Sequence, residues 1–212
     1  MARTRVKICG ITNPEDAAAA VAAGADAIGV IFAVSPRQVT LAEAAKALAD
    51  VPPPVARVGV FVNALSEEVA TAILACGLTA VQFSGSESPE DCDAAQIPVI
   101  KTVPIGMDFG LAGVEPFRDH AAALLLDTYH ADKAGGTSQT FDWRSLGPVP
   151  GWAPFFVAGG LTPDNVGECI AVLRPFAVDV SSGVESSPGV KDHTKLSALC
   201  AAVRAADLGV WG

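Results

Sequence analysis

The sequence contains few of the residues that build metal centres or disulfide frameworks. It has only three histidines, and its five cysteines form no CxxC pair. Cysteine and histidine at short spacings usually indicate a metal site, and cysteine-dense chains usually indicate a secreted scaffold. We therefore expect no metal, no disulfide and a cytoplasmic location.

Long apolar runs and an excess of positive charge are also missing. No stretch approaches the ~18–20 apolar residues of a membrane span, and the N-terminal MARTRVKICG lacks the apolar run of a signal peptide. The formal net charge of -9 disfavours nucleic acid and anionic lipid as main partners. A small anionic substrate needs only local positive potential and remains compatible with this composition.

Hydrophobic residues make up half of the 212 positions, and no Ser-, Gly- or Pro-rich linker divides the chain. We therefore expect one domain over residues 1–212. Short β-branched runs alternate with Ala-rich stretches of helical spacing. The predicted strands are 5–10, 27–32, 56–62, 80–83, 98–103, 123–127, 155–159 and 176–181.

Eight strand–helix units in roughly 200 residues predict a single (β/α)8 TIM barrel. A doubly wound open sheet is the alternative, but the GxGxxG turn is missing after the first strand. Capping residues predict helix starts at Asn13, Thr40, Ser88 and Thr162. The glycines and the proline near 111–119 predict a short or irregular element there.

Active sites of TIM barrels lie at the C-terminal ends of the strands, which selects Cys9. Val6 and Ile8 form one face of the first strand, so Lys7 and Cys9 share the other. Lys7 could lower the pKa of the thiol, or it could pair with Asp179 inside the barrel, and both interpretations stay open. The other four cysteines lie in helical stretches, where we expect them to pack as small hydrophobic side chains.

Glycine-rich turns follow the last two predicted strands, AGGL at 158–161 and DVSSGVE at 179–185. Such turns leave backbone N–H groups accessible, and in TIM barrels this region often holds a phosphate beside a short extra helix. We expect a phosphate site here, with SGVE forming the helix. The alternative is that Gly159 and Gly160 only permit tight turns.

Three charged residues are further candidates. Asp127 ends the sixth strand, where it could act as an acid opposite the cysteine or cap the next loop. Arg37, in SPR after the second strand, could bind a carboxylate or be a solvated surface charge. Lys101 lies in mid-strand, so we prefer a buried ion pair to a Schiff-base role. His130 and His193 are expected in loops without a role.

A set of motifs, in order and from end to end, resembles the phosphoribosylanthranilate isomerase family: KICGIT, GVIF followed by SPR, VGVFVN, VQ, LLLDT, GGT followed by FDW, AGGL with NV, and DVSSGVE followed by PGVKD. The family is a (β/α)8 barrel of tryptophan biosynthesis that works without cofactor or metal. The resemblance implies an Amadori rearrangement of a small phosphorylated substrate, N-(5-phosphoribosyl)anthranilate, into 1-(2-carboxyphenylamino)-1-deoxyribulose 5-phosphate.

The resemblance also implies roles. Cys9 matches the general base, Asp127 the general acid, and Arg37 the arginine that holds the anthranilate carboxylate. Asp179 lies near the substrate hydroxyls or supports the site. The remaining matched positions are the phosphate cradle and the loop after the sixth strand: Gly159, Gly160, Ser182 and Gly183, then Gly135 and Gly136.

Two positions depart from the family pattern. Ser84 stands where VQLHG has histidine, and Ser138 stands where GGTG has glycine. Neither change removes the implied acid or base, but both concern the shape of the site. A serine at the mouth of the fourth strand should leave a gap or a water. The segment 128–143, which contains Ser138, has no apolar period and predicts a mobile active-site loop.

The sequence is compatible with two alternative functions. A sister barrel isomerase of histidine biosynthesis performs the same chemistry on a ligand with two phosphates, but usually with two aspartates, and this chain has no Gly-rich turn after the third strand. A catalytically silent barrel could bind a phosphorylated ligand, against which Cys9 and Asp127 argue. A monomer and a homodimer are both compatible with the sequence.

Overall fold

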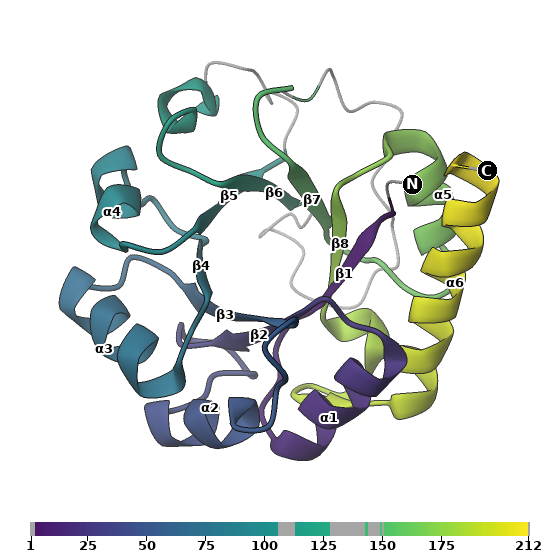
Figure 1. Cartoon of the computed structure of the whole chain (residues 1–212), viewed down its shortest axis with the longest axis horizontal. Helices are drawn as coiled ribbons and strands as arrows, with labels where there is room; N and C mark the ends of the chain where they lie inside the picture. Colours follow the sequence, from purple (N-terminus) through teal and green to yellow (C-terminus); the bar gives the residue numbers. More distant parts are fainter. Residues whose placement is uncertain (1–2, 106–112, 128–142, 144–148, 150, 212) are drawn as a thin grey trace.

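The computed structural model describes residues 3–105, 113–127, 143, 149 and 151–211, and its centre is a closed barrel of eight parallel strands (Figure 1). The strands are β1 (Arg5–Ile8), β2 (Ala27–Ile31), β3 (Ala56–Phe61), β4 (Ala80–Phe83), β5 (Val99–Pro104), β6 (Ala123–Asp127), β7 (Phe155–Ala158) and β8 (Ala177–Val180). β1 pairs with both β2 and β8, which closes the sheet. The predicted TIM barrel is confirmed, and the open-sheet alternative is wrong.

Helices surround the barrel, as Figure 1 shows in a view along the barrel. They are α1 (Pro14–Ala23), α2 (Leu41–Leu48), α3 (Ser66–Cys76), α4 (Pro89–Ala94), α5 (Val166–Leu173) and α6 (His193–Trp211). The side chains of Asn13, Thr40 and Ser88 cap their helices as predicted. The predicted start at Thr162 is too early, because a turn at 163–165 precedes α5 and the Asn165 side chain accepts the N–H of Thr162 at 2.8 Å.

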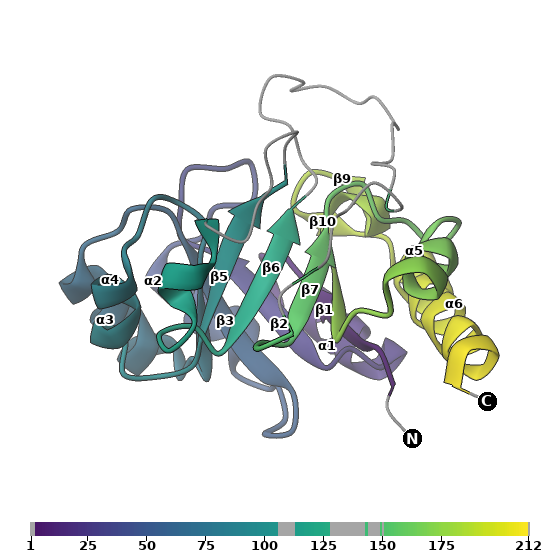
Figure 2. The ribbon, with the colours of Figure 1, turned by 90° about the horizontal axis from the view of Figure 1, so that it is seen from above.

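Among the βα units that the structure describes in full or in part, those after β5 and β8 depart from the regular pattern. Between β5 and β6 the described residues include the 3-10 turn η2 (Glu115–Phe117), which confirms the short element predicted there. After β8, the 3-10 turn η4 (Ser182–Val184) leads into an antiparallel pair, β9 (Glu185–Ser187) and β10 (Val190–Lys191). This hairpin was not predicted, and it lies at the end of the barrel toward which the strands point (Figure 2).

Apolar side chains form two layers around the strands. Val58, Leu125 and Phe156 belong to a cluster inside the barrel, whereas strand and helix residues such as Ile8 and Leu199 form the layer between barrel and helices. Successive strand residues alternate between the two layers. On β1 this alternation sends Val6 and Ile8 outward and the residues between and after them inward, as predicted.

The start of β1 and the C-terminal part of α6 lie at the barrel end opposite the hairpin (Figure 2). The backbone N–H of Thr4 donates to Asp207 Oδ2 at 2.9 Å, and its hydroxyl donates to Asp207 Oδ1 at 2.7 Å. Asp207 lies on α6, so the last helix is fastened to the residue that precedes β1. α6 begins at His193, which corrects the expectation that this histidine lies in a loop.

Candidate active site

The strand register places the polar candidates on the inner wall of the barrel. Lys7 pairs with Asp179 between β1 and β8, and Asp127 pairs with Ala158 between β6 and β7. Residues that are paired across neighbouring strands point to the same side of the sheet. Ala158, the partner of Asp127, belongs to the apolar cluster inside the barrel. The candidates therefore face the barrel interior, near the strand ends where TIM-barrel sites occur.

Lys7 and Asp179 form a buried ion pair inside the barrel. Lys7 Nζ donates to Asp179 Oδ2 at 2.7 Å, and the lysine side chain has no exposed surface. The structure thus shows the pairing with Asp179, which was one of the two interpretations that the sequence left open. The second oxygen, Oδ1, is also buried and accepts no hydrogen bond from the described residues.

Cys9 follows β1 directly and continues its ladder, because its N–H donates to Val180 O at 2.9 Å. A Cβ on Gly29 would lie 2.9 Å from the Cys9 sulfur, so the glycine in β2 leaves the space that the thiol occupies. Burial raises the pKa of the Cys9 thiol, and the nearby Lys7 ammonium opposes that shift without cancelling it. Lys7 therefore acts on the thiol in the predicted direction, but burial is the larger effect and the net pKa of Cys9 is raised.

Asp127 is the last residue of β6 and is partly buried. Its carbonyl accepts the N–H of Ile105 at 2.9 Å, which fixes the backbone at the point where the strand ends. β6 and β1 are separated on both sides of the barrel by other strands, so Asp127 and Cys9 come from different walls. The segment after Asp127 lies outside the described residues, together with four predicted positions: His130, Gly135, Gly136 and Ser138.

The turns after β7 and β8 touch through their backbones. Gly159 and Gly160 have φ values of 93° and 65°, a region that favours glycine. A Cβ on Gly183 would lie 1.9 Å from Leu161 O, a distance that no side chain can accommodate. The glycines are therefore required by turn geometry and by close backbone approach. η4 is the short helix that the SGVE motif predicted.

Arg37 makes a bidentate ion pair with Glu185. Nε donates to Oε1 at 2.8 Å and Nη2 to Oε2 at 2.7 Å. Burial would raise the pKa of Glu185, but hydrogen bonds from Arg37 and Lys191 outweigh it and lower that pKa. Arg37 is thus not a merely solvated surface charge.

Sequence reasoning assigned no role to Glu185 and Lys191, although both lie in quoted motifs, DVSSGVE and PGVKD. The available signal was a pair of opposite charges on either side of the turn SSPG, beside the predicted phosphate turn. Their ion pair at 2.8 Å appears only because the β9–β10 hairpin folds them together.

Ser84 lies where β4 ends, and its hydroxyl is already engaged. It accepts a hydrogen bond from Gln82 Nε2 at 3.0 Å and shares another with Thr102 Oγ1 at 2.8 Å. We expected a gap or a water at Ser84. The structure shows its hydroxyl held by these two hydrogen bonds between β4 and β5.

Lys101 confirms the preferred interpretation of a buried ion pair. Its Nζ lies 2.8 Å from Glu87 Oε2, and both side chains are almost fully buried. A lysine held in this way is poorly placed to form a Schiff base with a ligand.

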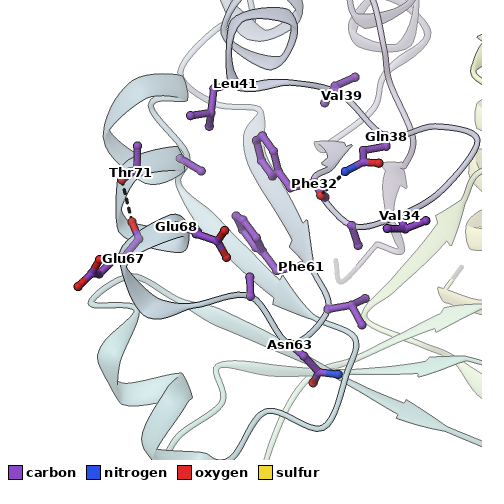
Figure 3. Close-up of a pocket in the computed structure, with 14 residues that line it drawn as sticks. Phe32, Val34, Gln38, Val39, Leu41, Phe61, Asn63, Glu67, Glu68 and Thr71 are labelled. Atoms are coloured by element: carbon purple, nitrogen blue, oxygen red, sulfur yellow. Dashed lines mark hydrogen bonds between the residues drawn. The ribbon is translucent and has the colours of Figure 1, made fainter.

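A cavity of about 760 Å³ lies elsewhere, between the second and third βα units (Figure 3). The stacked rings of Phe32 and Phe61, with centroids 5.0 Å apart, line it together with Glu67 and Glu68. None of the candidate site residues belongs to its lining. We therefore place the site by the polar residues at the strand ends, not by this cavity.

Neither a metal cluster nor a membrane span is found in the part of the chain that the structure describes. Those residues contain no group of three or more His, Cys, Asp or Glu side chains that could hold a metal ion. They also contain no helix that is long and apolar enough to cross a membrane.

Comparison with known proteins gives relatives over nearly the whole chain. The chain is 48% identical over 205 residues to an N-(5'-phosphoribosyl)anthranilate isomerase of Pseudomonas fluorescens, covering 96% of this chain and 97% of the relative. It is also 48% identical over 206 residues to an isomerase of the same name from Acidithiobacillus ferrooxidans, covering 96% and 99%.

Solved structures agree with these relatives. Phosphoribosyl anthranilate isomerase from Thermotoga maritima superposes with a TM-score of 0.88 at 40% identity, covering 95% of this chain and 99% of that one. A phosphoribosyl anthranilate isomerase in complex with reduced 1-(o-carboxyphenylamino)-1-deoxyribulose 5-phosphate has a TM-score of 0.81 at 38% identity, with 95% and 99% coverage. The family model described as N-(5'phosphoribosyl)anthranilate (PRA) isomerase matches residues 6–202. The chain therefore belongs to the N-(5'-phosphoribosyl)anthranilate isomerase family.

Proposed function

We propose that the chain converts N-(5'-phosphoribosyl)anthranilate into 1-(2-carboxyphenylamino)-1-deoxyribulose 5-phosphate, with Cys9 as general base and Asp127 as general acid. The observation that carries the proposal is the arrangement of a buried thiol and a carboxyl group at the ends of β1 and β6, within a barrel of this family. Because the two groups come from different walls, they can act on different atoms of one ligand between them.

The chemistry needs one proton delivered and one removed. Asp127 protonates the furanose ring oxygen as the bond from that oxygen to C1′ breaks, and the nitrogen lone pair forms a C1′=N bond. The resulting protonated Schiff base acidifies the proton on C2′. The Cys9 thiolate removes that proton, and the electrons of the C–H bond form C1′=C2′ and return the C=N pair to nitrogen. The enolamine then becomes the ketone when C1′ gains a proton and the C2′ hydroxyl loses one.

The rest of the site binds the two charged ends of the substrate. Arg37 holds the anthranilate carboxylate through a charge-assisted, bidentate contact. The backbone of Gly159, Gly160, Ser182 and Gly183 holds the phosphate. Asp179 Oδ1, a buried acceptor without a partner among the described residues, accepts a ribose hydroxyl. Gly136, in the segment that follows β6 in the sequence, is the further substrate-binding residue that the resemblance to the family implies.

We expect Cys9→Ala and Asp127→Asn each to lower kcat by about 10² to 10⁴-fold, because each removes a positioned proton-transfer group. Steady-state kinetics on N-(5'-phosphoribosyl)anthranilate, beside thermal unfolding, measures this. Cys200→Ala is the matched control: this buried thiol on α6 packs in the outer layer, so its loss should lower stability and spare kcat. A near-normal kcat in either site variant would contradict the roles, and absence of turnover in the unaltered protein would favour a silent barrel.

A further inference from the structure

A buried lysine beside Cys9 has no part in the mechanism above. The side chain of Lys191, on β10, has no exposed surface, and its Nζ donates to three acceptors. These are Cys9 O at 2.7 Å, Glu185 Oε1 at 2.8 Å and Ser181 O at 3.2 Å. An ammonium group has three N–H donors, so each donor has an acceptor. Lys191 is therefore fixed in place.

Two of these acceptors lie where the barrel ladder ends. Cys9 and Ser181 are the first residues beyond β1 and β8, and they precede, respectively, the turn into α1 and the 3-10 turn η4. The ammonium group binds both carbonyls at once and so joins the two strand ends beyond their last ladder bonds. This contact fixes the peptide of Cys9, and hence the direction in which its side chain leaves the backbone.

The third acceptor connects Lys191 to Arg37. Glu185 Oε1 accepts both Lys191 Nζ and Arg37 Nε at 2.8 Å, and Oε2 accepts Arg37 Nη2 at 2.7 Å. The Arg37 side chain has 20% exposed surface and that of Glu185 has 5%, so the carboxylate is the buried partner. A guanidinium can bind a second carboxylate through the edge formed by its two Nη atoms while its first edge is occupied.

We propose that Lys191 and Glu185 are positioning residues for the isomerisation. Lys191 holds the Cys9 backbone in the orientation needed for proton abstraction, and Glu185 holds the Arg37 guanidinium where the substrate carboxylate arrives. The inference rests on the proposed function, because Cys9 and Arg37 act on the substrate while Lys191 and Glu185 act only through them.

Lys191 should also affect the charge state of the base. Among the described residues, the charged groups that act on Cys9 are Lys7 from β1, Asp179 from β8 and Lys191 from β10, and both cations favour the thiolate. In Lys191→Met we expect kcat to fall at least tenfold. We also expect the rising limb of kcat/KM against pH to move to higher pH, because a thiol that loses a nearby positive charge ionises later.

Glu185→Gln should act differently, since it releases Arg37 and leaves the Lys191 charge in place. We expect KM for N-(5'-phosphoribosyl)anthranilate to rise at least tenfold, a smaller loss of kcat, and no movement of the rising limb to higher pH. Lys195→Met is the matched control: this exposed lysine of α6 donates to the Glu185 carbonyl at 2.8 Å but does not contact Cys9 or Arg37. Its pH profile should match that of the unaltered protein.

Kinetic values are to be corrected for the folded fraction, measured by thermal unfolding. A Lys191→Met variant with a normal kcat and pH profile would overturn the proposal. The same holds if Lys191→Met and Glu185→Gln change kcat by the same factor and also change KM by the same factor. If Lys191→Met does not fold, Glu185→Gln decides, and an unchanged KM overturns the proposal. The proposed function fails separately, through a near-normal kcat in Cys9→Ala.

Discussion

The properties of a residue in this barrel depend on its neighbours as well as on its own side chain. Cys9 has the type and position of a catalytic thiol, yet burial raises its pKa despite an ammonium group from its own strand. Gly29 supplies only empty space, but that space is where the Cys9 sulfur lies. The chemical behaviour of a residue at the C-terminal end of a strand therefore depends on the atoms that surround it.

Ser84 gives a prediction at this scale. Ser84→Ala removes the acceptor of Gln82 Nε2 and the partner of Thr102, and leaves a buried amide group unsatisfied. We expect a loss of about 1–3 kcal/mol in the free energy of unfolding and less than about a tenfold change in kcat/KM, because no proton-transfer group is lost. Denaturant titration with parallel kinetics tests it. Normal stability with a large loss of kcat would mean that the hydroxyl contacts the substrate.

Short elements after the strands, more than the strands themselves, build the candidate site. The turn after β7 contacts η4 through the backbone, and the β9–β10 hairpin carries both Glu185 and Lys191. These elements follow two neighbouring strands, so they converge at one side of the barrel mouth. The regular barrel holds them at fixed positions, and their own turn chemistry sets the local geometry.

Gly183 supplies the prediction for these elements. In Gly183→Ala the new Cβ would overlap Leu161 O, so the two turns must move apart. We expect KM for the phosphorylated substrate to rise by about tenfold or more, about 1.4 kcal/mol of lost binding, and the melting temperature to fall. Gly209→Ala, on the open surface of α6, is the control and should keep KM unchanged. Equal KM values in both variants would show that the phosphate does not bind at these turns.

At the scale of the whole molecule, stabilising contacts occur at both ends of the barrel, whereas the candidate site lies at one. The end that holds the chain termini is fastened by Thr4 and Asp207, while the opposite end carries the candidate site. Buried ion pairs such as Lys101–Glu87 connect neighbouring units around the barrel. Such pairs make the fold sensitive to acid, because each carboxylate must stay ionised to keep its partners.

Glu87 tests this sensitivity. Burial would raise its pKa, but hydrogen bonds from Lys101 and from the Asn63 N–H outweigh it and lower that pKa. A carboxyl group with a lowered pKa in the folded state stabilises the fold above its unfolded pKa, about 4.5, and loses this contribution as pH falls through the folded value. We expect Glu87→Gln to be about 3 kcal/mol less stable at neutral pH, a difference that shrinks below about pH 4.5.

Denaturant unfolding of both proteins across this pH range measures the effect. Glu67→Gln, at an exposed position of α3, is the control and should stay within about 0.5 kcal/mol at every pH. A stability difference that does not depend on pH would show that the Glu87 charge has no part in the effect.

The sequence by itself determined the fold class, the order of the strands and the strand ends at which Cys9, Asp127, Arg37 and the glycine turns lie. Those features depend on local patterns, alternation along strands and capping at helix starts, which neighbouring residues are sufficient to specify. Only the tertiary structure decided the partner of Lys7, the direction of the Cys9 pKa shift and the contacts of Arg37. Lys7 and Asp179 are 172 residues apart, Arg37 and Glu185 are 148 apart, and Lys191 and the Cys9 carbonyl are 182 apart. Closure of the barrel brings β1 against β8 and makes these groups neighbours, and no pattern along the chain specifies which of them meet.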